Sequence, residues 1–157
     1  MRMLRRSVSM AVAAVGSLAL TSCAETDALC DGVEQLAEIR AGTPPSDPVE
    51  IAEQYRELAL GYAEVAATLE DEEATESTFQ LAELYDQSAT VLDDHADADP
   101  DRLDELFAES EILVSLDQRM TTGEAMGFTR RAWEEIDDRC DISVDPRVND
   151  REEGVPG

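Results

Sequence analysis

Residues 47–69 read DPVEIAEQYRELALGYAEVAATL and carry the strongest helical pattern in the chain. Asp47 is a suitable N-cap, and Pro48 suits the first position of a helix. The apolar residues are alternately four and three apart, as the buried face of a helix requires: Ile51, Tyr55, Leu58, Tyr62, Val65 and Leu69. Three small residues flank this face and allow a neighbouring helix to approach closely: Ala59, Ala63 and Ala66. We therefore expect this helix at the centre of a bundle.

The same spacing also suits a coiled coil between two chains, because the pattern repeats every seven residues. The run covers fewer than three heptads, however, which is short for a coiled coil. An intramolecular bundle is the favoured interpretation, and the domain is expected to be monomeric.

One more helix is expected before this segment and another after it. Residues 26–40 carry an apolar stripe at helical spacing: Leu29, Val33, Leu36 and Ala37. Residues 42–46 then end that helix with glycine and proline. The helix after the central one should be capped by Thr75 or Ser77 and should end near Ala96.

A fourth helix should start at Asp99 or Asp101 and continue through Val114 as one segment. Thr121 and Glu124 have the spacing of a capping box and predict the start of a last helix that reaches Cys140. The predicted fold is thus all-α: an antiparallel bundle of four to five helices over residues 26–144. Residues 145–157 are polar and rich in proline and glycine, and a flexible tail is expected there.

The N-terminus has the layout of an export signal. Arg2, Arg5 and Arg6 precede an uncharged, mostly apolar run at residues 8–20. A run of 13 residues is too short to span a bilayer, which takes about 20. The residues around Arg5 and Arg6 depart from the twin-arginine pattern, so ordinary secretory export is favoured.

Leu20-Thr21-Ser22-Cys23 follows that run and resembles the lipobox of bacterial lipoproteins. The resemblance implies that a diacylglyceryl group is attached to the thiol of Cys23 and that residues 1–22 are removed. Residues 23–25 would then form a short tether, and the domain would lie on the extracytoplasmic face of the cell membrane. Two acyl chains give stable anchoring. The alternative is a plain secretory signal in which this cysteine is accidental.

Once Cys23 is assigned to the lipid, Cys30 and Cys140 remain. Two cysteines in an exported protein indicate one disulfide bond. Metal binding by this pair is disfavoured, because neither has a histidine or a second cysteine nearby. The bridge would join the first helix to the last.

The chain is strongly acidic, with 37 aspartates and glutamates, 12 arginines and no lysine, for a net charge of −25. This charge repels nucleic acid and anionic lipid headgroups, so binding to DNA or RNA is excluded and membrane contact must come from the lipid. It could attract cations or a basic partner, or serve only solubility. Arginine without lysine suggests a GC-rich genome. Overall the chain resembles small helical lipoproteins of actinobacteria, and the specific part of that resemblance covers residues 1–23.

The weak candidates for a metal site lie between the third and fourth helices. Asp97, Asp99 and Asp101 match three ligand positions of an EF-hand loop, but the glycine and final glutamate of that motif are missing. His95 is the only histidine. At the end of a helix it is better explained as a partner for the helix dipole. No cofactor is expected.

No catalytic set is apparent in the sequence: it lacks a nucleophile motif, a phosphate loop and a dinucleotide fingerprint. Trp133 and the three tyrosines are at core spacing, and the alternative is that they line a ligand cavity between helices. We therefore expect a non-enzymatic envelope lipoprotein that binds or positions another protein. The alternative is a module for a cation or small ligand, bound between Asp93 and Asp101 or in a pocket between helices.

Overall fold

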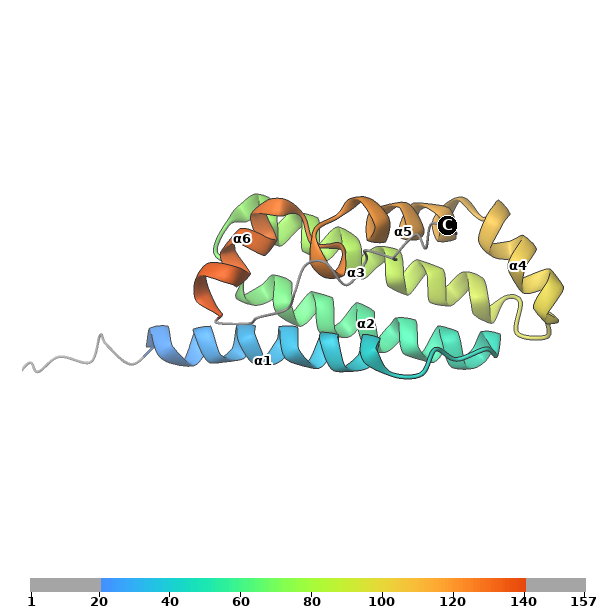
Figure 1. Ribbon diagram of the computed structural model, residues 1–157, viewed down its shortest axis with the longest axis horizontal. Helices are drawn as coiled ribbons and strands as arrows, with labels where there is room; N and C mark the ends of the chain where they lie inside the picture. The colour runs from blue at the N-terminus through green and yellow to red at the C-terminus, as the bar shows by residue number, and fades with distance from the viewer. Residues whose placement is uncertain (1–20, 141–157) are drawn as a thin grey trace, which may run out of the picture.

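The computed structural model describes residues 21–140, with side chains from Ala28 onward. In this part of the chain the backbone forms six α-helices, one 3₁₀ turn and no strand (Figure 1). They are α1 (Thr21–Ala41), α2 (Pro48–Thr68), α3 (Glu72–Asp93), α4 (Pro100–Glu109), α5 (Glu111–Thr122), η1 (Ala125–Gly127) and α6 (Arg130–Arg139). The predicted all-α antiparallel bundle is confirmed, with six helices in the described residues where four or five were expected.

Several predictions lie outside the described residues: the signal up to residue 20, the side chain of Cys23, and the chain beyond Cys140. The chain is already helical at Thr21, the first described residue and five residues before the predicted start of α1. Residues 21–25 contain neither proline nor glycine, so nothing in them interrupts a helix. The predicted start was therefore wrong.

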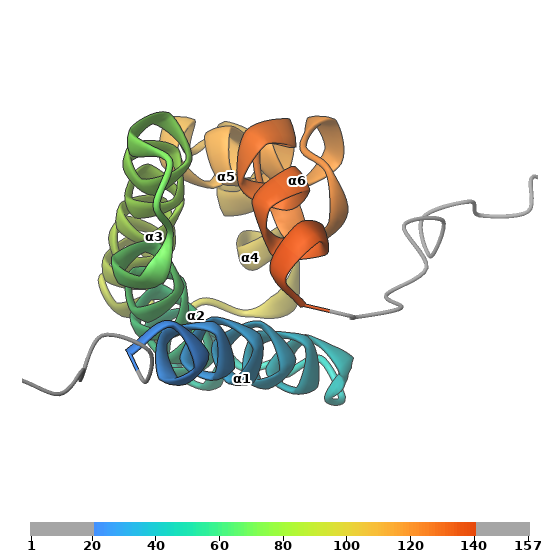
Figure 2. The same cartoon turned by 90° about the vertical axis from the view of Figure 1, so that its left-hand side faces the viewer.

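Helix α2 starts as its sequence predicts. The Asp47 carboxylate accepts a hydrogen bond from the Val49 amide at 2.9 Å, and Pro48 is the first helical residue. Helix α3 packs along α2, and α1 packs on another side of it (Figure 2). A Cβ atom at Gly61 would lie 2.7 Å from Leu36 Cδ2, so α1 approaches α2 closely where α2 has no side chain.

The buried apolar side chains form two clusters. The larger joins α1, α2, α3, α5 and α6, and its largest fully buried members are Tyr62, Phe128, Leu29, Leu36, Leu81 and Ile136. The smaller lies where α4 meets α2, α3 and α5: Ile51, Ala52, Ala89, Leu92, Leu103, Leu106 and Leu113. Tyr55 packs against both clusters, so the two are continuous.

Helix α3 is capped by Asp71, and the predicted caps Thr75 and Ser77 lie inside the helix. The Asp71 carboxylate accepts a hydrogen bond from the Ala74 amide at 2.8 Å. An ionised cap, followed by two glutamates in the first turn, interacts more favourably with the helix dipole than a hydroxyl does. The helix ends at Asp93, and the residues up to Ala96 form turns.

The single fourth helix of the prediction is divided at Ser110. This residue has ψ 118°, which is extended, and it ends α4 and precedes α5. The break lets Leu103 and Leu106 cover the smaller cluster while α5 turns back along α3 (Figure 1). The apolar face of one straight helix would point in a single direction. Because the chain is divided at Ser110, α4 and α5 can each turn their own apolar face towards the core.

The predicted capping box at Thr121 and Glu124 is also wrong. Thr121 lies within α5, where its hydroxyl donates to the Asp117 carbonyl oxygen at 3.0 Å. Helix α5 ends at Thr122, before an extended Gly123, and Met126 and Gly127 have φ of 60° and 79° in the turn that leads to α6. Helix α6 instead starts after Thr129, whose hydroxyl accepts from the Ala132 amide.

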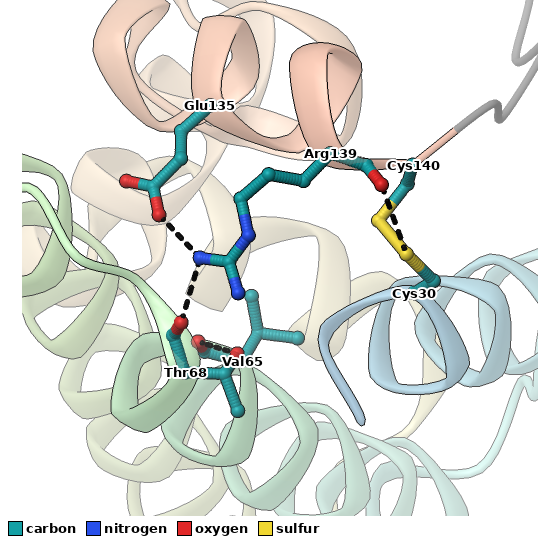
Figure 3. Close-up of a disulfide and its surroundings, with 6 residues drawn as sticks. All are labelled: Cys30, Val65, Thr68, Glu135, Arg139 and Cys140. Carbon is teal, nitrogen blue, oxygen red and sulfur yellow. Dashed lines mark hydrogen bonds and ion pairs between the residues drawn. A yellow bond between two sulfur atoms is a disulfide. The ribbon is translucent and has the colours of Figure 1, made fainter. Parts of the chain in front are cut away.

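Cys30 and Cys140 form a disulfide bond, as predicted. Their Cα atoms are 5.5 Å apart, and 110 positions separate them in the sequence. The bridge joins α1 to the end of α6 (Figure 3). It therefore connects the first and last described helices of the bundle.

We expect the double substitution Cys30→Ala/Cys140→Ala to lower the free energy of unfolding by about 4–5 kcal/mol, because a bridge of this span restricts the unfolded chain. Urea denaturation of the oxidised protein, compared with the variant, measures the difference. A reductant should destabilise the wild type to the level of the variant and leave the variant unchanged. Equal midpoints for wild type and variant would contradict the prediction.

Ser88 on α3 is fully buried, and its hydroxyl has no hydrogen-bond partner among the described residues. We expect Ser88→Ala to raise the free energy of unfolding by about 1 kcal/mol, because it removes an unsatisfied polar group from the core. Ser77→Ala is the matched control on the same helix. The Ser77 hydroxyl bonds the Ala74 carbonyl oxygen and the Thr129 hydroxyl, so its loss should be destabilising. Thermal melts that rank the two variants in the opposite order would refute this account.

Candidate functional site

The residues beside the disulfide form a polar junction between α6 and the turn that links α2 to α3 (Figure 3). Arg139 Nη1 donates to the Thr68 carbonyl oxygen at 3.0 Å and to Glu135 Oε1 at 2.7 Å. The Glu135 carboxylate also accepts from the Glu70 and Asp71 amides, at 2.7 and 3.1 Å. Only 16% of the Arg139 side chain and 14% of Glu135 are exposed. The junction thus provides hydrogen-bond partners for the backbone at the C-terminus of α2 and in the turn that follows, so its role is structural.

Two of the four weak metal candidates, His95 and Asp99, have structural roles as well. His95 Nδ1 donates to the Val91 carbonyl oxygen at 2.8 Å near the C-terminus of α3, as expected for a residue that completes a helix end. The Asp99 carboxylate accepts from the Arg102 amide at 2.9 Å and caps α4. Asp97 and Asp101 are exposed. Over residues 28–140, no three histidine, cysteine or carboxylate side chains are grouped so that they could hold a metal ion.

The aromatic residues form a continuous stack through the larger cluster. The Tyr85 ring lies 5.3 Å from the rings of both Tyr55 and Tyr62, and Phe128 lies 5.4 Å from Tyr62. Trp133 follows at 6.3 Å from Phe128. The Tyr62 hydroxyl donates to the Met126 carbonyl oxygen at 2.6 Å. These residues belong to the core or pack against it, as the helical spacing predicted.

A small pocket opens beside Tyr55 and Tyr85, where α1, α2 and α5 meet. Its volume is about 240 Å³, below the usual range of ligand pockets, about 300–1,000 Å³. Arg40 lies at its edge and donates to the Tyr85 hydroxyl at 3.1 Å. Because the one cation at this pocket already has a hydrogen-bond partner, the pocket gives little support to a small-ligand site.

An acidic cleft of about 590 Å³ lies between the α2–α3 turn and α6. It is lined by Glu70, Asp71, Arg131, Glu134, Glu135 and Asp138. Several of these side chains are already engaged: Asp71 caps α3, Glu135 binds two amides, and Arg131 lies 3.4 Å from Asp71. The cleft is therefore explained by the way in which this end of the bundle is held together.

The outer side of the α2–α3 pair carries a groove of about 600 Å³ with an apolar lining. Leu60 and Phe79 line it, and their exposed fractions are 67% and 41%. Small residues from both helices lie among its lining: Ala59, Ala63 and Ala82. We name this feature the α2–α3 groove. Among the described side chains, Val49 is the other large apolar residue that is exposed, at 40%.

The sequence did not single out Leu60 or Phe79, because both lie outside the buried stripes of their helices. The signal was nevertheless present. Each is a large apolar residue at a helical position where the pattern calls for a polar side chain. A scan for residues that break the apolar–polar pattern, rather than for those that follow it, would have found them.

Carboxylates surround the α2–α3 groove. Glu83 and Asp86 line it, while Glu57, Glu64 and Glu76 are exposed three or four positions from Leu60 or Phe79 along the helices. None of these five takes part in an ion pair with another described residue. Arg56, the one basic residue of the lining, already pairs with Asp93. The groove is thus apolar inside and negative at its edge.

No helix of the described chain combines the length and the apolar character needed to cross a bilayer. Comparisons with models of protein families, with curated proteins and with solved structures found no match to this chain. The geometry and the sequence therefore carry the functional argument.

Burial controls the chemistry of the tyrosines. It raises the pKa of Tyr55 to about 12, with a further contribution from Tyr85, and it raises the pKa of Tyr62 and of Tyr85 as well. In the unfolded chain all three should titrate near pH 10. As the pH rises, the unfolded state therefore loses these protons before the folded state does. The contribution of the three tyrosines to the free energy of unfolding is fully present below pH 10 and declines as the pH rises towards 12 and above.

We expect no tyrosinate absorbance from the folded protein at pH 10.5, where the denatured protein should show a large signal. Tyr55→Phe should lose less stability than the wild type between pH 10 and pH 12, because it lacks one of the groups whose pKa is raised. Absorbance titration together with circular dichroism measures both effects. A folded protein that titrates normally near pH 10 would show that the rings are accessible to water.

Proposed function

We propose that this chain is an extracytoplasmic lipoprotein whose helical bundle binds another protein of the cell envelope and performs no catalysis. The observation that carries the binding role is the exposed pair Leu60 and Phe79 in the α2–α3 groove. A protein with a net charge of −25 has ample polar side chains to cover its surface. An apolar groove on such a surface is typical of an interaction site.

The lipobox-like sequence supports the anchor, and the course of α1 fits it. The backbone at Cys23 is already helical, seven positions before Cys30. At a rise of about 1.5 Å per residue, the residue that carries the lipid would lie about 10 Å along the helix from the disulfide. A domain attached in this way stays close to the membrane, where its partners would also lie.

The non-catalytic part of the proposal follows from the use of the reactive side chains. The only histidine, His95, is bonded to backbone, and Cys30 and Cys140 are joined to each other. The ordinary pKa of tyrosine, near 10, already keeps the three tyrosines protonated at neutral pH, and burial raises the pKa of each further. None of these groups is prepared to act as a nucleophile or a base.

Crosslinking in intact cells tests the proposal, with Cys23→Ser as the paired variant. The wild-type chain should separate with membranes, carry a lipid on Cys23 in intact-mass analysis, and crosslink reproducibly to one envelope protein. Cys23→Ser should leave the membrane fraction and lose that crosslink, because the two proteins no longer share a surface. A product that keeps residues 1–22 or has an unmodified Cys23 contradicts the anchor. A lipidated chain without a reproducible protein neighbour contradicts the binding role.

A further inference from the structure

We infer that the α2–α3 groove binds a basic amphipathic helix supplied by the partner protein. The inference rests on the proposed binding role and specifies the chemistry of what is bound. Three properties of the groove carry it: its length, its small-residue lining between two large apolar side chains, and the sign of the charge around it.

The dimensions of the groove suit a helix. Its lining runs from Arg56 to Ala63 on α2 and from Phe79 to Gln87 on α3, about two turns of each helix. Alanines between Leu60 and Phe79 leave room for side chains from outside. A docked helix uses residues at positions i, i+3, i+4 and i+7 as anchors, which cover about two turns of its own length. One apolar face of a helix therefore matches this lining in extent.

The charge selects the kind of helix. Five carboxylates lie in or beside the groove without an ion-pair partner among the described residues, and Arg56 is neutralised by Asp93. A partner with lysine or arginine next to its apolar face would place cations against these carboxylates. Complementary charge of this kind speeds association and excludes other partners.

The same charge disfavours the other occupants. A second copy of this chain would bring its own five carboxylates against these five, and like charges across an interface oppose association. An anionic lipid surface would be repelled for the same reason. The basic helix is the one occupant that satisfies both the apolar lining and the acidic edge.

A synthetic peptide provides the probe. It is a helix of about 18 residues, five turns, built from leucine and lysine with leucine on one face. A scrambled peptide of the same composition has the same charge but no apolar face. Binding is measured by fluorescence anisotropy with the Cys23→Ser chain produced without residues 1–22. It carries neither the lipid nor the apolar run at residues 8–20, so it needs no detergent that would itself enter an apolar groove.

Three double variants locate the binding. Leu60→Ser/Phe79→Ser removes the apolar contacts, and Glu83→Lys/Asp86→Lys reverses charge at the groove. Asp104→Lys/Glu109→Lys makes the same change of charge on exposed residues of α4, at the far end of the bundle (Figure 1). All the substituted side chains are exposed except for part of Phe79, and circular dichroism confirms that each variant folds.

We expect the helical peptide to bind at least about tenfold more tightly than the scrambled one, since only an ordered apolar face fits the lining. The two groove variants should each weaken binding about tenfold, and the α4 variant less than about twofold. Binding should also weaken with salt, because the acidic edge is exposed to solvent. Equal affinity for both peptides, or equal loss in the groove and α4 variants, would overturn the inference.

Two further outcomes decide between occupants. A dimer in analytical ultracentrifugation that Leu60→Ser/Phe79→Ser dissociates would replace the basic helix with a second copy. In intact cells, a photo-crosslinker at position 60 or 79 should capture the same envelope neighbour, and Glu83→Lys/Asp86→Lys should abolish the capture. A neighbour captured from position 104 but not from 60 or 79 refutes the groove and leaves the proposed binding role standing.

Discussion

The attachment of α6 to the rest of the bundle is the constraint on which the described structure depends. An isolated helix of ten residues is not stable in water, so α6 must be held by its contacts. The disulfide to Cys30 holds its end, and the Glu135–Arg139 pair binds it to the backbone where α2 ends and α3 begins. So held, α6 contributes Ala132 and Ile136 to the larger cluster, and Phe128 just before it becomes fully buried.

The acidic composition shapes the fold through helix ends rather than through ion pairs. Aspartates 47, 71 and 99 cap α2, α3 and α4, and Glu135 binds amides in the α2–α3 turn. In each place the carboxylate accepts from amides that a helix leaves without partners. Five arginines of the described side chains form ion pairs, which leaves most carboxylates free. The outer surface therefore stays negative around any apolar area that it contains.

Hydrophobic spacing predicted the fold class and the central helix, and the count of cysteines left after Cys23 predicted the disulfide, since each depends on residues that the sequence displays directly. Hydrophobic spacing did not predict where the helices begin and end. The break at Ser110 allows Leu106 and Leu113, which lie on different helices, to reach the same smaller cluster, and the turn at Met126 has a positive φ. Hydrophobic spacing reveals neither feature. The cap on α3 was missed because Asp71 stands among glutamates, and the hydroxyls of Thr75 and Ser77 follow within the same few residues. The groove was missed because the search followed the buried stripe, from which Leu60 and Phe79 are excluded.

The proposed anchor and the α2–α3 groove are compatible because they occupy different parts of the bundle. Helix α1 begins at the end where α2 finishes, α3 starts and α6 is bridged (Figure 1). Lipid on Cys23 would place that end, with its acidic cleft, towards the membrane, and repulsion by anionic headgroups would keep the helices from lying flat on it. The groove lies midway along α2 and α3, so it would face the space above the bilayer. A basic helix from a neighbouring envelope protein could then reach Leu60 and Phe79 without displacing lipid.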